Sequence, residues 1–125
     1  MKLAALSLIV PDYQAGLQFF CTRLGFTLID NVDQGLKRWV TIRAPDGGPL
    51  LVLSRAENPT QTAAIGNQCG GRVWLFLETD DFARDAAIIT AAGGVFEEEP
   101  RVEPYGKVAV WQDPFGNRWD LIQRA

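Results

Sequence analysis

The 125-residue sequence contains no histidine and two cysteines. Without histidine, the chain lacks the imidazole group that many general acids and bases and many catalytic metal sites use. Cys21 and Cys69 form neither a CxxC pair nor a disulfide framework, and neither has an imidazole to activate it. We therefore expect reduced thiols, a cytoplasmic location and no thiol catalysis.

The chain also lacks a surplus of positive charge and a long hydrophobic run. Twelve Lys and Arg residues stand against fifteen Asp and Glu residues, for a net charge of −3. This balance excludes a basic surface for phosphate backbones, so we expect no nucleic-acid partner. The longest apolar runs, such as residues 3–10, are far shorter than a bilayer span, so we expect no membrane partner. No small-residue cleavage site follows the start, and we expect no signal peptide.

The first half of the sequence predicts one strand, one helix and three further strands. Residues 3–10 form the first apolar run, and Asp12 after Pro11 is a suitable helix cap. A helical face follows at the spacing of one side of a helix, and Gly25 ends it. The remaining strands are expected at 26–30, 37–43 and 50–54. The members of the helical face are Tyr13, Gly16, Leu17, Phe20 and Leu24.

The second half repeats this order. A strand is expected at 72–79, a helix from Asp81 to about Ala92, and strands at 95–97, 107–112 and 118–123. Residues 56–62 are polar and predicted to be a loop. We thus predict an α+β fold with two βαβββ modules in one domain spanning 1–125. Module 1 covers about 1–55, a linker 56–70 and module 2 about 71–125. Together they would form a curved eight-stranded mixed sheet with a concave face.

Two phrases carry a family resemblance. The first combines Val10-Pro11-Asp12-Tyr13 with Leu24-Gly25-Phe26, and the second is Asp113-Pro114-Phe115-Gly116-Asn117 followed by a strand. In this order and spacing they resemble the glyoxalase / bleomycin-resistance / extradiol-dioxygenase superfamily, which has the vicinal oxygen chelate fold. The resemblance implies that metal-dependent members would place ligands at the positions of Ala5, Trp74, Leu51 or Val52, and Asp120. Among these residues, Asp120 alone offers a suitable donor, so we expect no metal and no cofactor.

Strand alternation indicates which residues face the expected concave surface. If Ala5 and Trp74 point inward, the polar and aromatic residues of the same parity do so too, whereas the opposite parity is apolar and suits packing beneath the helices. Trp74 either lines a pocket or closes the core, and Trp111 is a pocket wall or a core residue. Arg72 and Arg118 either contact a ligand or pair with Glu78 and Asp120. The predicted ligand-binding residues are Ser7, Arg72, Trp74, Phe76, Glu78, Trp111, Arg118 and Asp120.

Two functions of different classes fit these residues. In the first, the protein binds a small, partly aromatic molecule on the concave face. Such members of the resembled family commonly pair, so the resemblance implies a homodimer. In the second, a metal-independent lyase or isomerase uses Glu78 and Asp120 as acid and base. A third possibility is a divergent subunit that packs against a partner. The sequence does not identify the ligand or a reaction.

Overall fold

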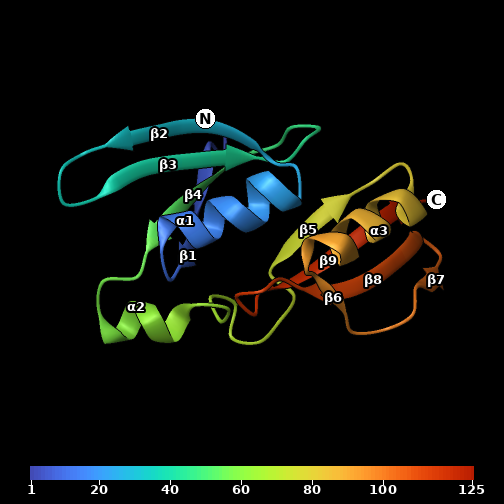
Figure 1. Cartoon of the computed structure of the whole chain (residues 1–125). Coiled ribbons are helices and arrows are strands. Elements are labelled where there is room, and N and C mark those ends of the chain that lie inside the picture. The colour runs from blue at the N-terminus through green and yellow to red at the C-terminus, as the bar shows by residue number, and fades with distance from the viewer. The chain divides into compact units, whose positions relative to one another are not determined.

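Each half of the chain begins with a strand that leads through a capping aspartate into a helix, as expected. In the computed structural model, which describes residues 1–125, the Asp12 carboxylate accepts a hydrogen bond from the Ala15 amide at 2.7 Å. The Asp81 carboxylate accepts the equivalent bond from Arg84 at 3.0 Å. Each cap satisfies an amide that would otherwise lack a partner in the first helical turn. The chain divides into two compact units, Met1–Ala64 and Ile65–Ala125, which are described separately (Figure 1).

The first unit contains a four-stranded sheet in the order β1-β4-β3-β2. Strands β1 and β4 are parallel, and the other neighbours are antiparallel. The bounds are β1 Ala5–Val10, β2 Thr27–Asp33, β3 Arg38–Arg43 and β4 Leu50–Arg55. Helix α1, Tyr13–Leu17, continues as a π-helix over Gln18–Arg23, and α2 spans Pro59–Ala64.

The core of the first unit lies between the α1 segment and one face of the sheet. Leu8 and Val10 are fully buried, whereas Ser7, which precedes Leu8 and points to the opposite face, is exposed. Phe20 is fully buried, and its ring lies 4.9 Å from the Phe19 ring and 5.6 Å from the Phe26 ring, measured between centroids. The expected parity of the first strand is therefore correct. Each fully buried aromatic or aliphatic side chain contributes on the order of 2 kcal/mol.

The second unit repeats the topology with one additional strand. Its sheet has the order β5-β9-β8-β6, and β7 also pairs with β8. Strands β5 and β9 are parallel, as β1 and β4 are, and their neighbours are antiparallel. The bounds are β5 Leu75–Glu78, α3 Phe82–Ala92, β6 Val95–Phe96, β7 Arg101–Glu103, β8 Gly106–Gln112 and β9 Arg118–Arg124.

Two tryptophans form the centre of the second core. Trp111 and Trp119 are cross-strand neighbours in β8 and β9, and their rings stack with centroids 5.2 Å apart. Their exposed fractions are 0% and 2%. The Trp119 indole N–H donates to the Asp113 carboxylate at 2.9 Å, which ties this core to the turn that follows β8. This bond satisfies the buried indole nitrogen of Trp119.

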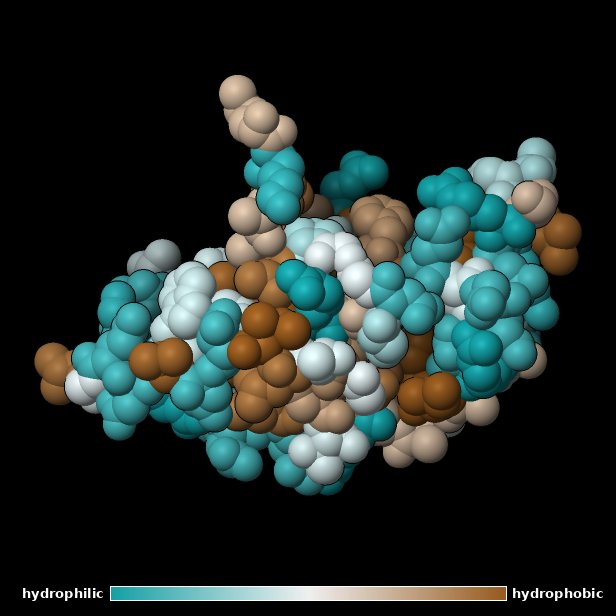
Figure 2. All heavy atoms as spheres, turned by 90° about the horizontal axis from the view of Figure 1, so that it is seen from above, coloured by the Kyte–Doolittle hydropathy of each residue, from teal (hydrophilic) through white to brown (hydrophobic).

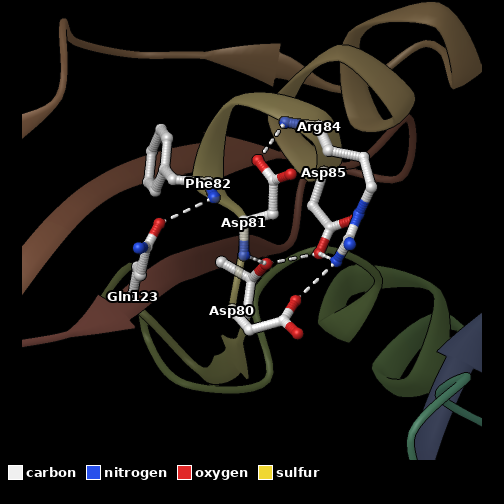
Figure 3. A network of polar contacts seen from close by, with 7 residues as sticks. Asp80, Asp81, Phe82, Arg84, Asp85 and Gln123 are labelled. Atoms are coloured by element: carbon white, nitrogen blue, oxygen red, sulfur yellow. Dashed lines mark hydrogen bonds and ion pairs between the residues drawn. The ribbon is translucent and has the colours of Figure 1, made fainter.

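The start of α3 is fixed by several polar contacts (Figure 3). Besides the Asp81 cap, the Phe82 amide donates to the Gln123 side chain of β9 at 2.8 Å. Arg84 forms an ion pair with Asp80 at 2.8 Å, with both side chains largely exposed. The contact through Gln123 anchors the helix start to the sheet, while the exposed pair adds little stability.

The structure corrects four expectations. The sheet is not one eight-stranded sheet: nine strands form sheets of four and five, although the α+β class is confirmed. The segment 56–62 is not a loop throughout, because α2 occupies Pro59–Ala64. The strand expected at 72–79 begins later, at Leu75, because residues 69–72 form turns. Strand β7, Arg101–Glu103, was not expected at all.

The surface carries apolar groups among hydrophilic ones (Figure 2). Several large hydrophobic side chains are more than 40% exposed, including three of the edge strand β2. None of the helices is both long enough and apolar enough to cross a membrane. The three residues of β2 are Leu28, Ile29 and Val32.

Candidate functional site

A hollow of about 420 Å³ lies on the sheet face of the second unit. Phe76 of β5 and Asp120 of β9 contribute its floor, and they are direct neighbours in the parallel strand register. Arg118 precedes Asp120 by two residues and therefore lies on the same face. The segment that leads into β5 completes the wall. The lining residues are Gly71, Arg72, Val73, Phe76, Arg118 and Asp120.

Asp120 is the most unusual group in this hollow. Its Oδ1 atom is buried and accepts no hydrogen bond. Phe76 is its neighbour on β5 and Val110 its neighbour on β8, so the carboxyl group lies between two apolar side chains. Burial raises the pKa of Asp120, and the nearby Glu98 acts in the same direction, while Arg101 and Arg118 oppose the shift. Burial thus favours the protonated form of this carboxyl group more than water does.

Arg118 is held in place by contacts on two sides. Its Nε and Nη2 atoms donate to the two carboxylate oxygens of Glu97 at 2.8 and 2.9 Å, a bidentate arrangement. Its Nη1 atom donates to the Gly71 carbonyl oxygen at 2.9 Å. The Arg118 hydrogen bond lowers the pKa of Glu97 despite partial burial. Arg118 therefore fixes the position of the wall at Gly71, and its charge is neutralised by Glu97.

Four of the eight predicted ligand-binding residues line the hollow: Arg72, Phe76, Arg118 and Asp120. Glu78 lies two residues beyond Phe76 and therefore on the same face of β5, but outside the hollow. It is exposed and forms an ion pair with Arg124 at 2.9 Å. The expected alternative in which Arg118 pairs with Glu78 or Asp120 is wrong, because Glu97 takes that place.

The other predicted residues lie elsewhere. Trp74 immediately precedes β5, where its amide donates to the Arg118 carbonyl at 2.9 Å, and its side chain is half-buried. Trp111 points to the opposite face of the sheet, as its pairing with Trp119 requires, and it occupies the core. Ser7 is exposed on β1 of the first unit. The hollow thus does not include these three residues.

Sequence reasoning missed Glu97, the first of three consecutive glutamates that follow β6. The amide of Glu97 donates to the Val110 carbonyl at 2.9 Å, so the run continues along the sheet beyond β6. Glu97 and Glu98 then bind Arg118 and Arg101. The alternation of apolar residues before the run, Val95 and Phe96, was the available signal for the direction of these side chains.

The register also settles which fourth-strand residue shares the face of Ala5. Ala5 pairs with Leu50 and Ser7 with Val52, so Val52 has the matching parity and Leu51 points into the core. The side chains at the four positions are therefore Ala5, Val52, Trp74 and Asp120. Three of them have no lone pair for a metal. No group of three or more His, Cys, Asp or Glu side chains is placed to hold a metal ion.

The sequence matches a known protein family over almost its whole length. The family model described as Glyoxalase/Bleomycin resistance protein/Dioxygenase superfamily matches residues 2–121. The chain belongs to this superfamily. An uncharacterized protein of Shewanella frigidimarina is 45% identical over 121 residues, which cover 94% of this chain and 90% of that protein.

Two solved structures from Streptomyces sp. CB03234 resemble the whole chain. TnmS3, an antibiotic binding protein, is 26% identical, with a TM-score of 0.78 and coverage of 100% of this chain and 97% of that one. A glyoxalase/bleomycin resistance protein is 28% identical, with a TM-score of 0.74 and coverage of 98% and 100%. An antibiotic-binding protein is thus among the solved structures that this chain resembles.

Proposed function

We propose that this superfamily member binds a small, partly aromatic molecule in the hollow of its second unit. The observation that carries the proposal is the pairing of an exposed aromatic ring, Phe76, with a carboxyl group that the protein leaves short of donors, Asp120. A volume of about 420 Å³ lies within the usual range of small-molecule sites. The likeness to TnmS3, an antibiotic binding protein, supports a binding role.

We further propose that the metal site of metal-dependent members is lost here. The support is chemical. At the positions that the family resemblance assigns to metal ligands, the side chains of Ala5, Val52 and Trp74 have no lone pair that could coordinate a metal ion. Metal analysis of the purified protein after dialysis tests this point. Less than one metal ion in ten chains is expected, and a stoichiometric, tightly bound transition metal would overturn it.

Tryptophan fluorescence provides the direct test of binding, because half-buried Trp74 lies just before the strand that carries Phe76. A library of flat aromatic compounds should contain members that quench the emission saturably. Affinity should fall at least tenfold in Phe76→Ala. Val102→Ala is the matched control, since Val102 is 87% exposed, belongs to the same unit and does not line the hollow. If no compound quenches saturably across a broad library, the binding proposal fails.

A second candidate function, metal-independent acid–base catalysis, is favoured by one observation. Burial raises the pKa of Asp120 towards the range useful for a general base. Glu78, the other expected participant, is exposed and paired with Arg124, so Asp120 is the sole group we assign to this role. Turnover of a bound compound that is lost in Asp120→Asn even at saturating concentrations of that compound would establish catalysis. Binding without turnover would leave the protein a binder.

We also propose that two copies of the chain associate. The edge strand β2 exposes Leu28, Ile29 and Val32, and its neighbour β3 exposes Trp39, each between 41% and 50%. Exposed apolar side chains at a sheet edge favour association. Light scattering coupled to size-exclusion chromatography should give twice the chain mass. The mass of a single chain at micromolar concentration would contradict the association.

A further inference from the structure

The charged side chains that line the hollow differ in how many of their hydrogen-bonding atoms are already used by the protein. Arg118 lines the hollow, yet all three of its nitrogen atoms already donate, two to Glu97 and one to Gly71. Three of its five N–H donors are thus in use, and its charge is already paired with a carboxylate. Asp120 is in the opposite condition, because it lines the hollow, is partly exposed and forms no ion pair, and its buried Oδ1 atom accepts no hydrogen bond.

The other charged residues nearby do not satisfy Asp120. No ion pair within 4.0 Å includes Asp120 or Arg72. Arg101, whose charge acts on Asp120 from a distance, is occupied by Glu98 at 2.6 Å and Glu103 at 2.9 Å. The guanidiniums of Arg101 and Arg118 thus have carboxylate partners of their own, whereas Asp120 and Arg72, which both line the hollow, are in no ion pair.

The aromatic group next to this carboxyl group is equally available. Phe76 is the direct cross-strand neighbour of Asp120, and 65% of its surface is exposed. The face of an aromatic ring attracts a cation by about 0.5 to 2 kcal/mol, more where the site is desolvated. It also stacks with another aromatic ring in an offset or edge arrangement.

We infer that the ligand of the hollow is an aromatic compound with a protonated amine. The ammonium group donates to the Asp120 carboxylate, and the ring packs on Phe76. This assignment rests on the proposed binding function and names its ligand class. A carboxylate and an exposed ring side by side attract a cation. Arg118 is occupied by Glu97, and Arg72 lies on the segment before β5, outside the Phe76–Asp120 row, so an anionic group on Phe76 would meet the repulsion of Asp120.

Three probes with one ring system test the charge preference. They are 2-naphthylmethylamine, naphthalen-2-ylmethanol and 2-naphthoate, which carry a positive charge, no charge and a negative charge at pH 7.5. Isothermal titration calorimetry should give the tightest binding for the amine, at least tenfold tighter than for the naphthoate. Asp120→Asn should reduce the affinity for the amine at least tenfold and leave that for the alcohol within threefold.

A matched control separates the local charge from the net charge. Asp80→Asn removes the same charge from an exposed aspartate at the start of α3, outside the hollow, and should leave all three affinities unchanged. Equal binding of the three probes, or preference for the alcohol or the naphthoate, would overturn the amine assignment and leave the binding function standing. If none of the probes binds up to 5 mM, the amine assignment is overturned as well. The library screen with Phe76→Ala then decides the binding function by itself.

Discussion

Phe76 and Asp120 are direct cross-strand neighbours in the parallel β5–β9 pair, and Val110 of β8 flanks Asp120 on its other side. This row places a carboxyl group between two apolar side chains on the face away from α3. The same row therefore explains two properties of Asp120. Its pKa is raised because its charged form is poorly solvated, and its partly exposed side chain lines the hollow without an ion-pair partner.

Asp120→Asn should raise the stability of the free protein at neutral pH. A carboxyl group whose pKa is raised by folding binds more protons in the native state than in the unfolded state. Its contribution to stability therefore falls as the pH rises through the interval between the two pKa values. Thermal unfolding should show a higher Tm for Asp120→Asn at pH 8, with the advantage shrinking towards pH 4. A lower Tm than that of the parent at pH 8 would contradict the unpaired state of Asp120.

Truncation to alanine should affect the free energy of unfolding little at Phe76 and strongly at Trp111. Phe76→Ala removes an exposed ring, so the free energy of unfolding should change by less than about 1 kcal/mol while ligand quenching is weakened. Trp111→Ala opens a cavity in the core beside Trp119, at a cost of roughly 3 to 5 kcal/mol. Urea unfolding of both variants checks the difference. A cost below about 1 kcal/mol for Trp111→Ala would return this residue to the expected pocket wall.

The Glu97–Arg118 pair should contribute measurably to the free energy of unfolding. Both side chains are about 70% buried and the contact is bidentate, so a double-mutant cycle with Glu97→Gln and Arg118→Met should give a coupling of up to about 1 kcal/mol. Because Arg118 lowers the pKa of Glu97, this stabilisation is present above the unfolded pKa of a glutamate and is lost as the pH falls below it. A coupling that persists unchanged at pH 3 would contradict the assignment.

Asp113 should be among the residues least tolerant of substitution. Its carboxylate accepts hydrogen bonds from the amides of Phe115 and Asn117, the Asn117 side chain and the Trp119 indole, at 2.8 to 3.0 Å. Asp113→Ala would remove the acceptor of the buried Asn117 amide and the Trp119 indole, at a cost of about 3 kcal/mol or more. Chemical denaturation measures this cost. Asp46→Ala, in an exposed turn of the first unit, is the control and should change little.

The duplicated topology was predictable because it depends on local signals. Asp12 and Asp81 cap their helices through their own side chains, and the alternation around Leu8 or Trp119 reports the buried face directly. Asn58-Pro59 was also such a signal for α2, since the Asn58 side chain accepts from the Gln61 amide at 2.8 Å and proline suits the first helical turn. This signal was overlooked because the polar composition of residues 56–62 favoured a loop.

The candidate site was predictable in part. Parity selected Phe76, Arg118 and Asp120 correctly for one face, because strand pairing preserves it. The alternation of side chains along a strand does not predict which charged residues form ion pairs with each other. Arg118 and Glu97 are 21 residues apart and meet because the chain after β6 runs alongside β8. Asp120 has no ion-pair partner because Arg118 pairs with Glu97 instead. No local sequence pattern predicts this long-range contact.

Gly66 should be irreplaceable for a reason that Gly70 does not share. Both have positive φ, +71° and +64°, so an alanine at either site carries a backbone strain of roughly 1 kcal/mol. A Cβ at Gly70 would meet nothing within 4 Å, whereas a Cβ at Gly66 would overlap the carbonyl oxygen of Phe115. That oxygen belongs to the turn that Asp113 holds, so it has little freedom to move.

Gly66→Ala should therefore destabilise the protein by at least 2 kcal/mol more than Gly70→Ala, as measured by urea denaturation. The difference between the two variants removes the shared cost of positive φ and isolates the contact with the turn. Equal costs would mean that the segment around Gly66 moves away from Phe115 freely, and that the turn gains no support from it. Retention of ligand quenching in Gly70→Ala would show that this variant is folded and that the comparison is valid.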